Sequence, residues 1–373
     1  MGITLLGHIR FCNKVTGNPT RDIVRLGLVV AYAMLFASCL YAIQNVWNFS
    51  LFVSDARTYW EYSLHLEQPY STWWVPGYPI ILAIARLLTH SWLTPLQTMQ
   101  SISLICFVLA GQLLFQICEI RRLGLRPIIL ITLAWSVFPF VGITYAVYPI
   151  ADALVFVLLL GILLALEAHK HVWAIILIGI ALITHKITWY FLPGLFIYLW
   201  VKDAKIRKYL WIPVLPLAVL EVAGAIYHDN VLWLVEWSYH KLLAPRGHLP
   251  LFDGILGPWF GGDYFDKGKS VIIFGLMIWT VFILRKSIVS KLWVPAILAI
   301  GLFAMIATIN QYENWAVVRF GKILIPLSVL SFQIKIPPLS RKLELGCLAP
   351  AMAILLVSYL SNLWYGYYMT RYW

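Results

Sequence analysis

The stretch SDARTYWEY, residues 54–62, and the stretch YSTWWVPGYP, residues 70–79, interrupt a chain that is otherwise strongly apolar. They bring acidic, basic, hydroxyl and aromatic side chains together directly after the first long apolar segment. A polar cluster beside a membrane span is costly and marks a functional site. The two stretches therefore predict a functional loop at the surface of a membrane, and the apolar segments on either side predict membrane-spanning helices.

The composition of the whole chain indicates a membrane protein. Of its 373 residues, 61% are hydrophobic and 12% are charged, and the mean hydropathy is +0.82. Soluble domains have about a quarter charged residues. The net charge of +12 does not predict nucleic-acid binding, because most Lys and Arg residues stand in short clusters between apolar segments, as the positive-inside rule expects. The five cysteines show no metal-like spacing, and no disulfide framework is expected.

The placement of positive charge predicts the topology. Basic residues precede the first apolar segment, which indicates a cytoplasmic N-terminus and a first span that is retained rather than cleaved. Segment 76–92 is short for a crossing, and a crossing there would bring Arg121 and Arg126 to the outer side. Segments 54–67 and 77–91 are therefore expected to form two juxtamembrane helices on the outer side.

The same charge rule divides the rest of the chain into spans that alternate in direction. The prediction is an all-α polytopic membrane protein, one domain over residues 1–373, with larger outer loops at 48–95 and 228–269. Eleven spans are expected, at about 26–47, 96–119, 127–148, 153–168, 172–184, 188–201, 209–227, 270–284, 292–309, 323–334 and 345–364.

The expected outer side collects the candidate functional residues. Transfer of a sugar from a phosphate carrier needs a carboxylate to take the proton of the acceptor hydroxyl and cations to stabilise the leaving phosphate. The sequence has no Gly-rich loop for a nucleotide, and sugar nucleotides are cytoplasmic, so a lipid-phosphate donor fits outer residues better. The candidates are Asp55, Arg57, Tyr59, Glu61, Tyr78, Asp152, His185, Lys186, Arg319 and Lys322.

Each candidate in the first loop also has a structural interpretation. Asp55 is the first candidate for the catalytic base, and Asp55 and Tyr59 share one face of the expected helix. Asp55 could instead cap the N-terminus of that helix, and the two roles are compatible. Arg57 could bind phosphate, or it could pair with Glu61 four residues further along the helix.

The later candidates stand at the expected ends of spans, where structural roles are common. Asp152 could stabilise the N-terminus of its helix. Lys186 could extend its ammonium group to the membrane interface. Arg319 and Lys322 could anchor the chain at that interface.

The long loop 228–269 contains scattered charged residues. His240 and His248 suggest a metal site, but their spacing matches no compact site, so no cofactor is expected and a divalent metal is left open. A loop of this size over a membrane site commonly gates the site or positions the substrate.

Five segments, in order along the chain, resemble the GT-C class of integral-membrane glycosyltransferases. The closest likeness is to the bacterial aminoarabinose transferase and protein O-mannosyltransferase-like group. SDARTY at 54–59 resembles the acidic motif of the first outer loop, and VPGYPIIL at 75–82 resembles the Pro-rich juxtamembrane helix. Segment 145–152 resembles the part that ends in a second aspartate, and ALITHK at 181–186 resembles a Leu-Thr-Lys signature. RFGKILIP at 319–326 is more loosely similar to an Arg-Tyr-Leu-Leu-Pro element.

The resemblance covers residues 20–200 well and the remainder loosely. It implies a GT-C-like fold and an inverting transfer from a polyprenyl-phosphate-sugar donor to a lipid, glycan or peptide acceptor. The transfer would take place on the outer face of a bacterial inner or plasma membrane. Asp55 would match the catalytic carboxylate, Asp152 a second essential acid, and Lys186 a contact to the donor phosphate. Many members have paired acids in the first loop, whereas here Ala56 and Arg57 follow Asp55.

Two other activities share parts of this pattern. A flippase or other transporter of lipid-linked sugars needs polar residues along the middle of several spans. The expected spans 26–47, 127–148, 153–168 and 270–284 have almost none at mid-depth, which favours the transferase. A polymerase or ligase of lipid-linked glycans would use the same outer-face chemistry with a diphosphate-linked donor, and this alternative remains open.

Overall fold

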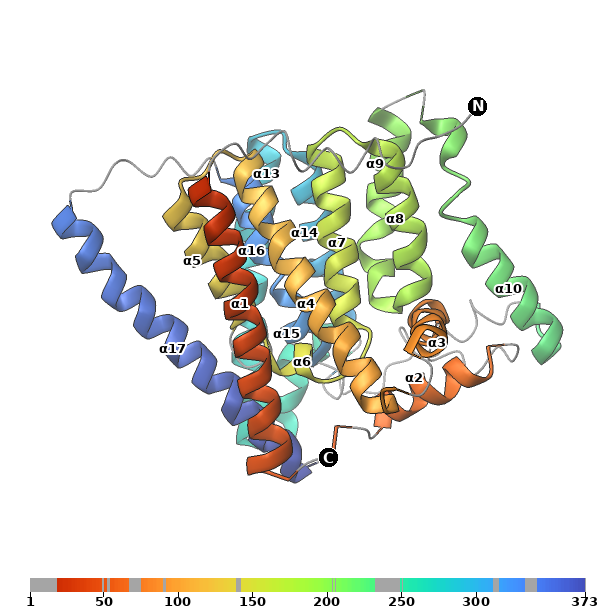
Figure 1. The fold of residues 1–373 in the computed structure, drawn as a ribbon. Coiled ribbons are helices and arrows are strands. Elements are labelled where there is room, and N and C mark those ends of the chain that lie inside the picture. The colour runs from red at the N-terminus through yellow and green to blue at the C-terminus, as the bar shows by residue number, and fades with distance from the viewer. Residues whose placement is uncertain are drawn as a thin grey trace.

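The computed structural model describes residues 19–48, 50–51, 54–66, 75–89, 92–138, 142–202, 204, 206–231, 249, 251–310, 315–332 and 341–372. Over these residues the protein is all-helical and contains no strand. The expected all-α class is therefore confirmed. Most helices stand side by side in one bundle, while the last helix crosses one side of it obliquely (Figure 1).

The helices vary widely in length. In chain order the α-helices are α1 (Pro19–Tyr41), α2 (Ser54–Leu64), α3 (Gly77–Thr89), α4 (Pro95–Ile120), α5 (Leu125–Ser136), α6 (Thr144–Val147), α7 (Asp152–Glu167), α8 (His171–Thr184), α9 (Leu192–Lys202), α10 (Leu215–His228), α12 (Asp253–Leu256), α13 (Tyr264–Val289), α14 (Trp293–Thr308), α15 (Trp315–Gly321), α16 (Leu324–Ser331) and α17 (Arg341–Tyr372). A π-helical turn, η3 (Ala42–Val46), extends α1, and short 3-10 helices are η4 (Lys186–Tyr190), η5 (Arg207–Tyr209) and η6 (Gly257–Phe260).

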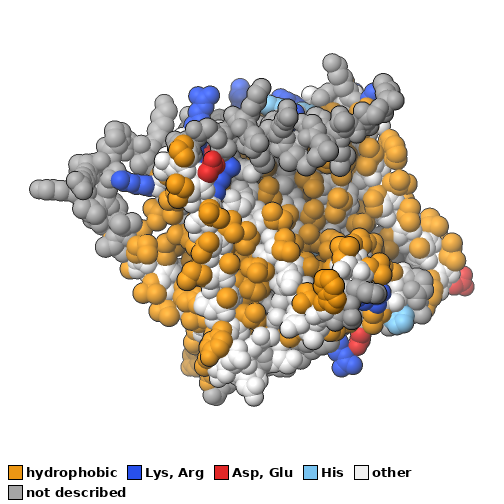
Figure 2. Space-filling model, in the orientation of Figure 1, with side chains coloured by type: hydrophobic (Ala, Val, Ile, Leu, Met, Phe, Trp, Pro, Cys, Tyr) orange, Lys and Arg blue, Asp and Glu red, His pale blue; other side chains and the backbone are white. Residues whose placement is uncertain are grey.

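Several of these helices suit a membrane. Within the described part of the chain, three are long and apolar enough to cross one, namely Pro19–Val46, Pro95–Ile120 and Asp266–Val289. Shorter apolar helices accompany them, including α5, α8, α9, α10 and α14. Figure 2 shows hydrophobic side chains over the middle of one face, with Lys and Arg gathered along its upper edge. This arrangement is that of a membrane protein.

Two segments differ from the helices expected from the sequence. The span expected at 127–148 is not one continuous helix, because α5 ends at Ser136 and the short α6 begins only at Thr144. The stretch before the span expected at 323–334 is not simply a loop, because α15 lies immediately ahead of α16. Both segments lie beside the residues that form the candidate site.

Local sequence explains how α3 and α4 begin. Thr94 caps α4 by accepting a hydrogen bond from the Gln97 backbone N–H, and the Gln97 side chain accepts one from the Thr94 backbone N–H. This capping box satisfies two N–H groups that the helix itself leaves unpaired. At the start of α3, a Cβ atom on Gly77 would lie 2.6 Å from the carbonyl oxygen of Ile183. Only glycine therefore lets α3 approach the end of α8 this closely.

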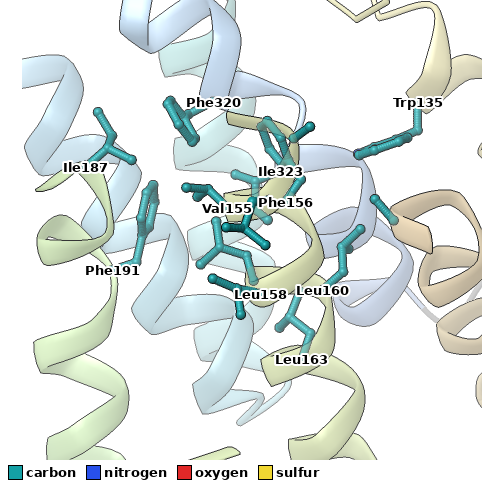
Figure 3. Close-up of a cluster of buried hydrophobic side chains, with 14 of the residues drawn as sticks. Trp135, Val155, Phe156, Leu158, Leu160, Leu163, Ile187, Phe191, Phe320 and Ile323 are labelled. Carbon is teal, nitrogen blue, oxygen red and sulfur yellow. The ribbon is translucent and has the colours of Figure 1, made fainter. Parts of the chain in front are cut away.

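The core is centred on α7, which packs between α4 and α8. Nearly every residue of α7 is buried, as expected of a helix that is apolar on all sides. Figure 3 shows Val155, Phe156 and Leu158 of α7 beside two aromatic rings. These are Phe191, directly before α9, and Phe320 of α15. This packing brings α15 beside the first turns of α7.

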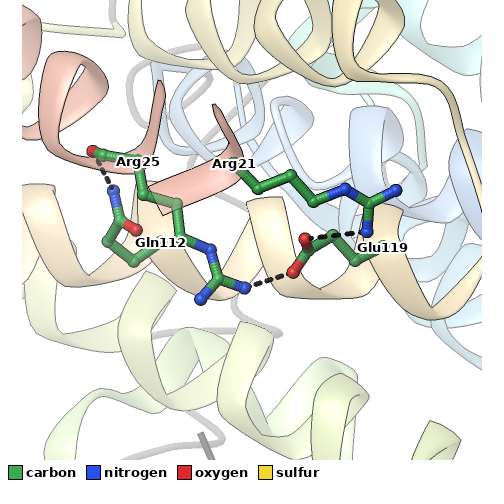
Figure 4. Close-up of polar contacts among 4 residues, drawn as sticks. All are labelled: Arg21, Arg25, Gln112 and Glu119. Carbon is green, nitrogen blue, oxygen red and sulfur yellow. Dashed lines mark hydrogen bonds and ion pairs between the residues drawn. The ribbon is translucent and has the colours of Figure 1, made fainter. Parts of the chain in front are cut away.

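A charged cluster joins α1 to α4 at one end of the bundle. Arg25 pairs with the Glu119 carboxylate, and Arg21 Nη1 lies 3.3 Å from the other carboxylate oxygen (Figure 4). Gln112 Nε2 donates to the backbone carbonyl of Arg25 at 3.4 Å. The Glu119 side chain is 2% exposed, and the two arginines compensate its buried charge. We call this the Glu119 end of the bundle.

The Glu119 end lies opposite the start of α7. Arg121, just after α4, pairs at 2.9 Å with Glu167, the last residue of α7. The 16 residues of α7 extend over about 24 Å, and Asp152 is the first of them. We call the opposite side the Asp152 end.

Candidate functional site

The candidate site is centred on Asp152, whose side chain is 3% exposed. Its Oδ2 accepts a hydrogen bond from Arg319 Nη1 of α15 at 3.1 Å. The N-cap position of α7 is taken by Ala151, which makes no side-chain cap. The Asp152 carboxylate is therefore directed at Arg319, and it gains further stability from the positive end of the α7 dipole.

His185 approaches the other oxygen of the same carboxylate. Its Nε2 lies 3.9 Å from Asp152 Oδ1, and its Nδ1 accepts a hydrogen bond from the backbone N–H of Ile187 at 3.1 Å. Because Nδ1 is an acceptor, the proton of the neutral ring sits on Nε2 and faces Asp152. Burial lowers the pKa of His185 to about 4, with Asp152 opposing this shift. The ring is therefore neutral at pH 7.

Lys322 follows Arg319 by one turn and is also buried, with 3% exposure. Its Nζ lies 3.9 Å from the ring centroid of Phe156 and 4.4 Å from that of Trp135. Cation–π contacts of this kind stabilise a desolvated ammonium group. An interfacial anchor would have its ammonium group at the protein surface, so this geometry does not fit the anchoring interpretation of Lys322.

Tyr59 connects the first loop to this cluster. Its side chain is buried, and its ring meets the Tyr78 ring edge-on with centroids 5.0 Å apart. Burial raises the pKa of the Tyr59 hydroxyl. The carboxylates of Asp55 and Asp152 raise this pKa further, whereas Arg319 lowers it. The Tyr59 hydroxyl therefore lies within the electrostatic reach of both candidate acids and stays protonated.

The remaining candidates lie around this centre. Lys186 directly follows His185, and its Nζ is buried, 5.8 Å from the ring centroid of Trp189. A buried Nζ does not fit the interpretation that Lys186 extends to the membrane interface. Arg57 and Glu61 form an exposed pair at 2.8 Å on α2. They point away from the buried face of α2 that carries Tyr59, and so lie apart from the Asp152 centre.

No match was found among protein-family models, curated proteins or solved structures.

The described residues contain no group of three or more His, Cys, Asp or Glu side chains that could hold a metal ion. His240 and His248, the only pair that suggested one, lie outside the described residues, as does most of the loop expected at 228–269. Asp55 lies in the first turn of α2 and is partly buried. That position agrees both with a role in helix capping and with a role as a base.

Three aromatic residues of the site were not predicted from the sequence. Trp135 and Phe156 hold Lys322, while Phe320 stacks on Phe156 and lies 5.9 Å, between ring centroids, from His185. In a chain with 15% aromatic residues, no local pattern separates these from the aromatic residues of a membrane interface. Their role becomes visible only when α5, α7 and α15 come together.

Proposed function

We propose that this protein is a membrane glycosyltransferase that moves a sugar from a polyprenyl-phosphate donor to a lipid, glycan or peptide acceptor. The observation that carries this proposal is the ion pair of the buried Asp152 with the partly buried Arg319, with His185 and Lys322 around it. Buried charges are expensive, so a concentration of them at one end of an apolar bundle supports a functional site.

The cations of the site suit the donor phosphate. Arg319 presents a planar guanidinium that matches phosphate oxygens, and Asp152 fixes its orientation. Lys186 adds an ammonium group near the same centre. Burial lowers the pKa of Lys322 to about 7, so its amine is about half protonated at pH 7, and a bound phosphate would favour the protonated form. A surplus of positive charge in a water-poor site would stabilise the phosphate as the bond from the sugar to the phosphate oxygen breaks.

The carboxylate of Asp55 is the proposed general base. It would accept the proton of the acceptor hydroxyl as that oxygen attacks the anomeric carbon of the sugar, and the polyprenyl phosphate would leave with the bonding electron pair. The Asp152 carboxylate already accepts a hydrogen bond from Arg319, so the Asp55 carboxylate is the better candidate for the base. A single displacement of this kind inverts the configuration at the anomeric carbon.

The proposed topology places the Asp152 end on the outer side of the membrane and the Glu119 end in the cytoplasm. Clusters of Lys and Arg follow or precede helices at the Glu119 end, including Arg121, Lys170, Arg207 and Lys286, as the positive-inside rule expects. We further propose that the chain crosses eleven times, with the shorter helices crossing as parts of the packed bundle and with α2 and α3 at the outer interface.

The proposal is tested with the full-length protein in lipid nanodiscs and a panel of radiolabelled polyprenyl-phosphate sugars. Transfer of label to a water-soluble peptide, a glycan or a second lipid supports the enzyme. In proteoliposomes, movement of intact labelled donor between leaflets without transfer would instead indicate a transporter. Activity only with diphosphate-linked oligosaccharides would indicate a polymerase or ligase.

Lys186→Ala is expected to weaken donor binding by about tenfold or more, because one charge-assisted contact to phosphate contributes roughly 1.5–3 kcal/mol. Binding is measured by titrating the nanodisc protein with a fluorescent polyprenyl phosphate. Lys186→Arg, which keeps the charge, should bind nearly as well. Equal affinity of the Ala variant and the unaltered protein would remove Lys186 from the phosphate site.

A further inference from the structure

The side-chain amide of Asn362, in α17, is fully bonded. It is 0% exposed. Its Nδ2 donates to the carbonyl oxygens of Val137 and Phe138 at 3.2 and 3.0 Å, and its Oδ1 accepts from the backbone N–H groups of Ile143 and Thr144 at 3.0 and 3.4 Å. One side chain thereby bonds to the backbone on both sides of the break between α5 and α6.

The bonded segment leads directly to Asp152. The Thr144 hydroxyl donates to the Asn362 carbonyl oxygen at 2.8 Å. The Tyr148 backbone N–H then donates to the Thr144 carbonyl at 3.0 Å, and the Ile150 N–H donates to the Tyr148 carbonyl at 2.8 Å. An unbroken series of hydrogen bonds therefore connects Asn362 to the residues immediately before α7.

Tyr365, one turn further along α17, contacts α15, the helix that carries Arg319. Its buried ring lies 4.4 Å, between centroids, from the ring of Trp315, the first residue of α15. Arg319 lies one turn after Trp315 on the same helix. Residues three apart share one face of a helix, so Asn362 and Tyr365 present a single face of α17 to the segments that carry Asp152 and Arg319.

The remainder of α17 makes fewer contacts with the bundle. In Figure 1 its first part extends away from the other helices, while its last part lies beside the end of α1. Apolar side chains such as Met352, Ile354 and Val357 are more than half exposed, at 52%, 65% and 65%. The buried contacts of Asn362 and Tyr365 therefore lie in the part of α17 that packs against the α5–α6 break and the start of α15.

We propose that the Asn362–Tyr365 face of α17 is a brace that fixes the position of Asp152 relative to Arg319, and that Asn362 is a positioning residue for the transfer reaction. The effect on kcat rests on the proposed function. The effect on the mobility of the segment before Asp152 does not. Loss of Asn362 would leave four backbone groups of the α5–α6 break without their buried partner. The segment before Asp152 would then move more freely, while the cationic residues themselves stay intact.

The test is hydrogen–deuterium exchange of the full-length protein in nanodiscs, followed by mass spectrometry. In Asn362→Ala, peptides covering Ile143 and Thr144 should exchange about tenfold faster, since two amide hydrogen bonds are lost. Peptides at the Glu119 end should be unchanged. The matched control is Thr280→Val, which removes an equally buried hydroxyl that bonds only within its own helix, to Leu276.

Kinetics separates a brace from a merely stabilising contact. In Asn362→Ala, kcat for sugar transfer should fall about tenfold while KM for the donor changes less than about twofold, because Asp152 loses its position but the cations remain. Thr280→Val should retain both values. If Asn362→Ala does not fold, Thr144→Val, which removes only the hydroxyl that bonds to Asn362, should show the same pattern to a smaller extent.

Exchange that stays unchanged at residues 142–148, or that rises equally in all helices, would overturn the brace. So would a loss of kcat in Thr280→Val equal to that in Asn362→Ala. If the unaltered protein transfers no sugar from any donor, the proposed function fails, but the exchange experiment still decides whether Asn362 holds the segment before Asp152.

Discussion

Asp152→Asn is expected to destabilise the protein by about 3–5 kcal/mol, the usual result of removing one member of a buried ion pair. The remaining partner explains the size of the effect. Arg319 has a side chain that is only 19% exposed, so its charge cannot be fully hydrated there. Unfolding of the protein in nanodiscs or mild detergent, followed by tryptophan fluorescence, measures the change. Transfer activity should be lost as well.

A double variant separates stability from chemistry. Asp152→Leu combined with Arg319→Met removes both charges and fills the space with apolar groups, a change that is commonly neutral or stabilising for buried pairs. We expect its stability to recover most of the loss, with transfer still absent because the proposed phosphate contact is gone. A double variant that is as unstable as Asp152→Asn would show that the ion pair is not the source of the effect.

The helical class and the approximate positions of the helices could be predicted from the sequence, because apolar segments and basic clusters are local signals. The helices expected at 54–67 and 77–91 correspond to α2 and α3. The segment expected to be a single span at 127–148 contains instead the break between α5 and α6. Hydropathy did not reveal this break because its residues are as apolar as those of a helix.

The site was partly predictable for the same reason. Asp152, Lys322 and Arg319 are ionisable residues beside apolar segments, where charge is expensive, so each could be singled out. Their pairing could not be predicted, because Asp152 and Arg319 are separated by 167 positions and meet only through the packing of α7 against α15. The exposed pair of Arg57 and Glu61 illustrates the converse, since four-residue spacing made that contact predictable.

Asn362 could have been recognised from one sequence signal. It is the one amide side chain in the last apolar stretch, residues 345–364, and a polar residue in such a stretch usually contacts protein rather than lipid. The sequence alone could not name its partners. Four bonds of its side chain reach backbone groups at 137–144, and the type of a residue does not show what its backbone groups bond to.

Asp55→Asn is expected to slow sugar transfer by about 10²–10⁴-fold, the usual contribution of a general base. The amide has the same shape as the carboxylate but accepts a proton far less readily, so the acceptor hydroxyl would be a weaker nucleophile. Asp55 lies at a partly buried position in the first turn of α2, and the fold should tolerate its replacement with a loss of at most about 1 kcal/mol. Donor binding should be nearly unchanged, because the cations proposed to bind the phosphate lie on other segments.

Two matched variants complete this experiment. Asp22→Asn removes a carboxylate from the first turn of α1 at the far end of the bundle and should retain full activity, which controls for loss of a first-turn charge. Asp55→Glu keeps a carboxylate but displaces it by one methylene, and it should retain more activity than Asp55→Asn. If Asp55→Asn transfers sugar at the rate of the unaltered protein, the base is not Asp55, and Asp152 becomes the acid to test. A loss of donor binding in Asp55→Asn would instead place Asp55 in the phosphate site, where its charge would have to be balanced by Arg319 or Lys322.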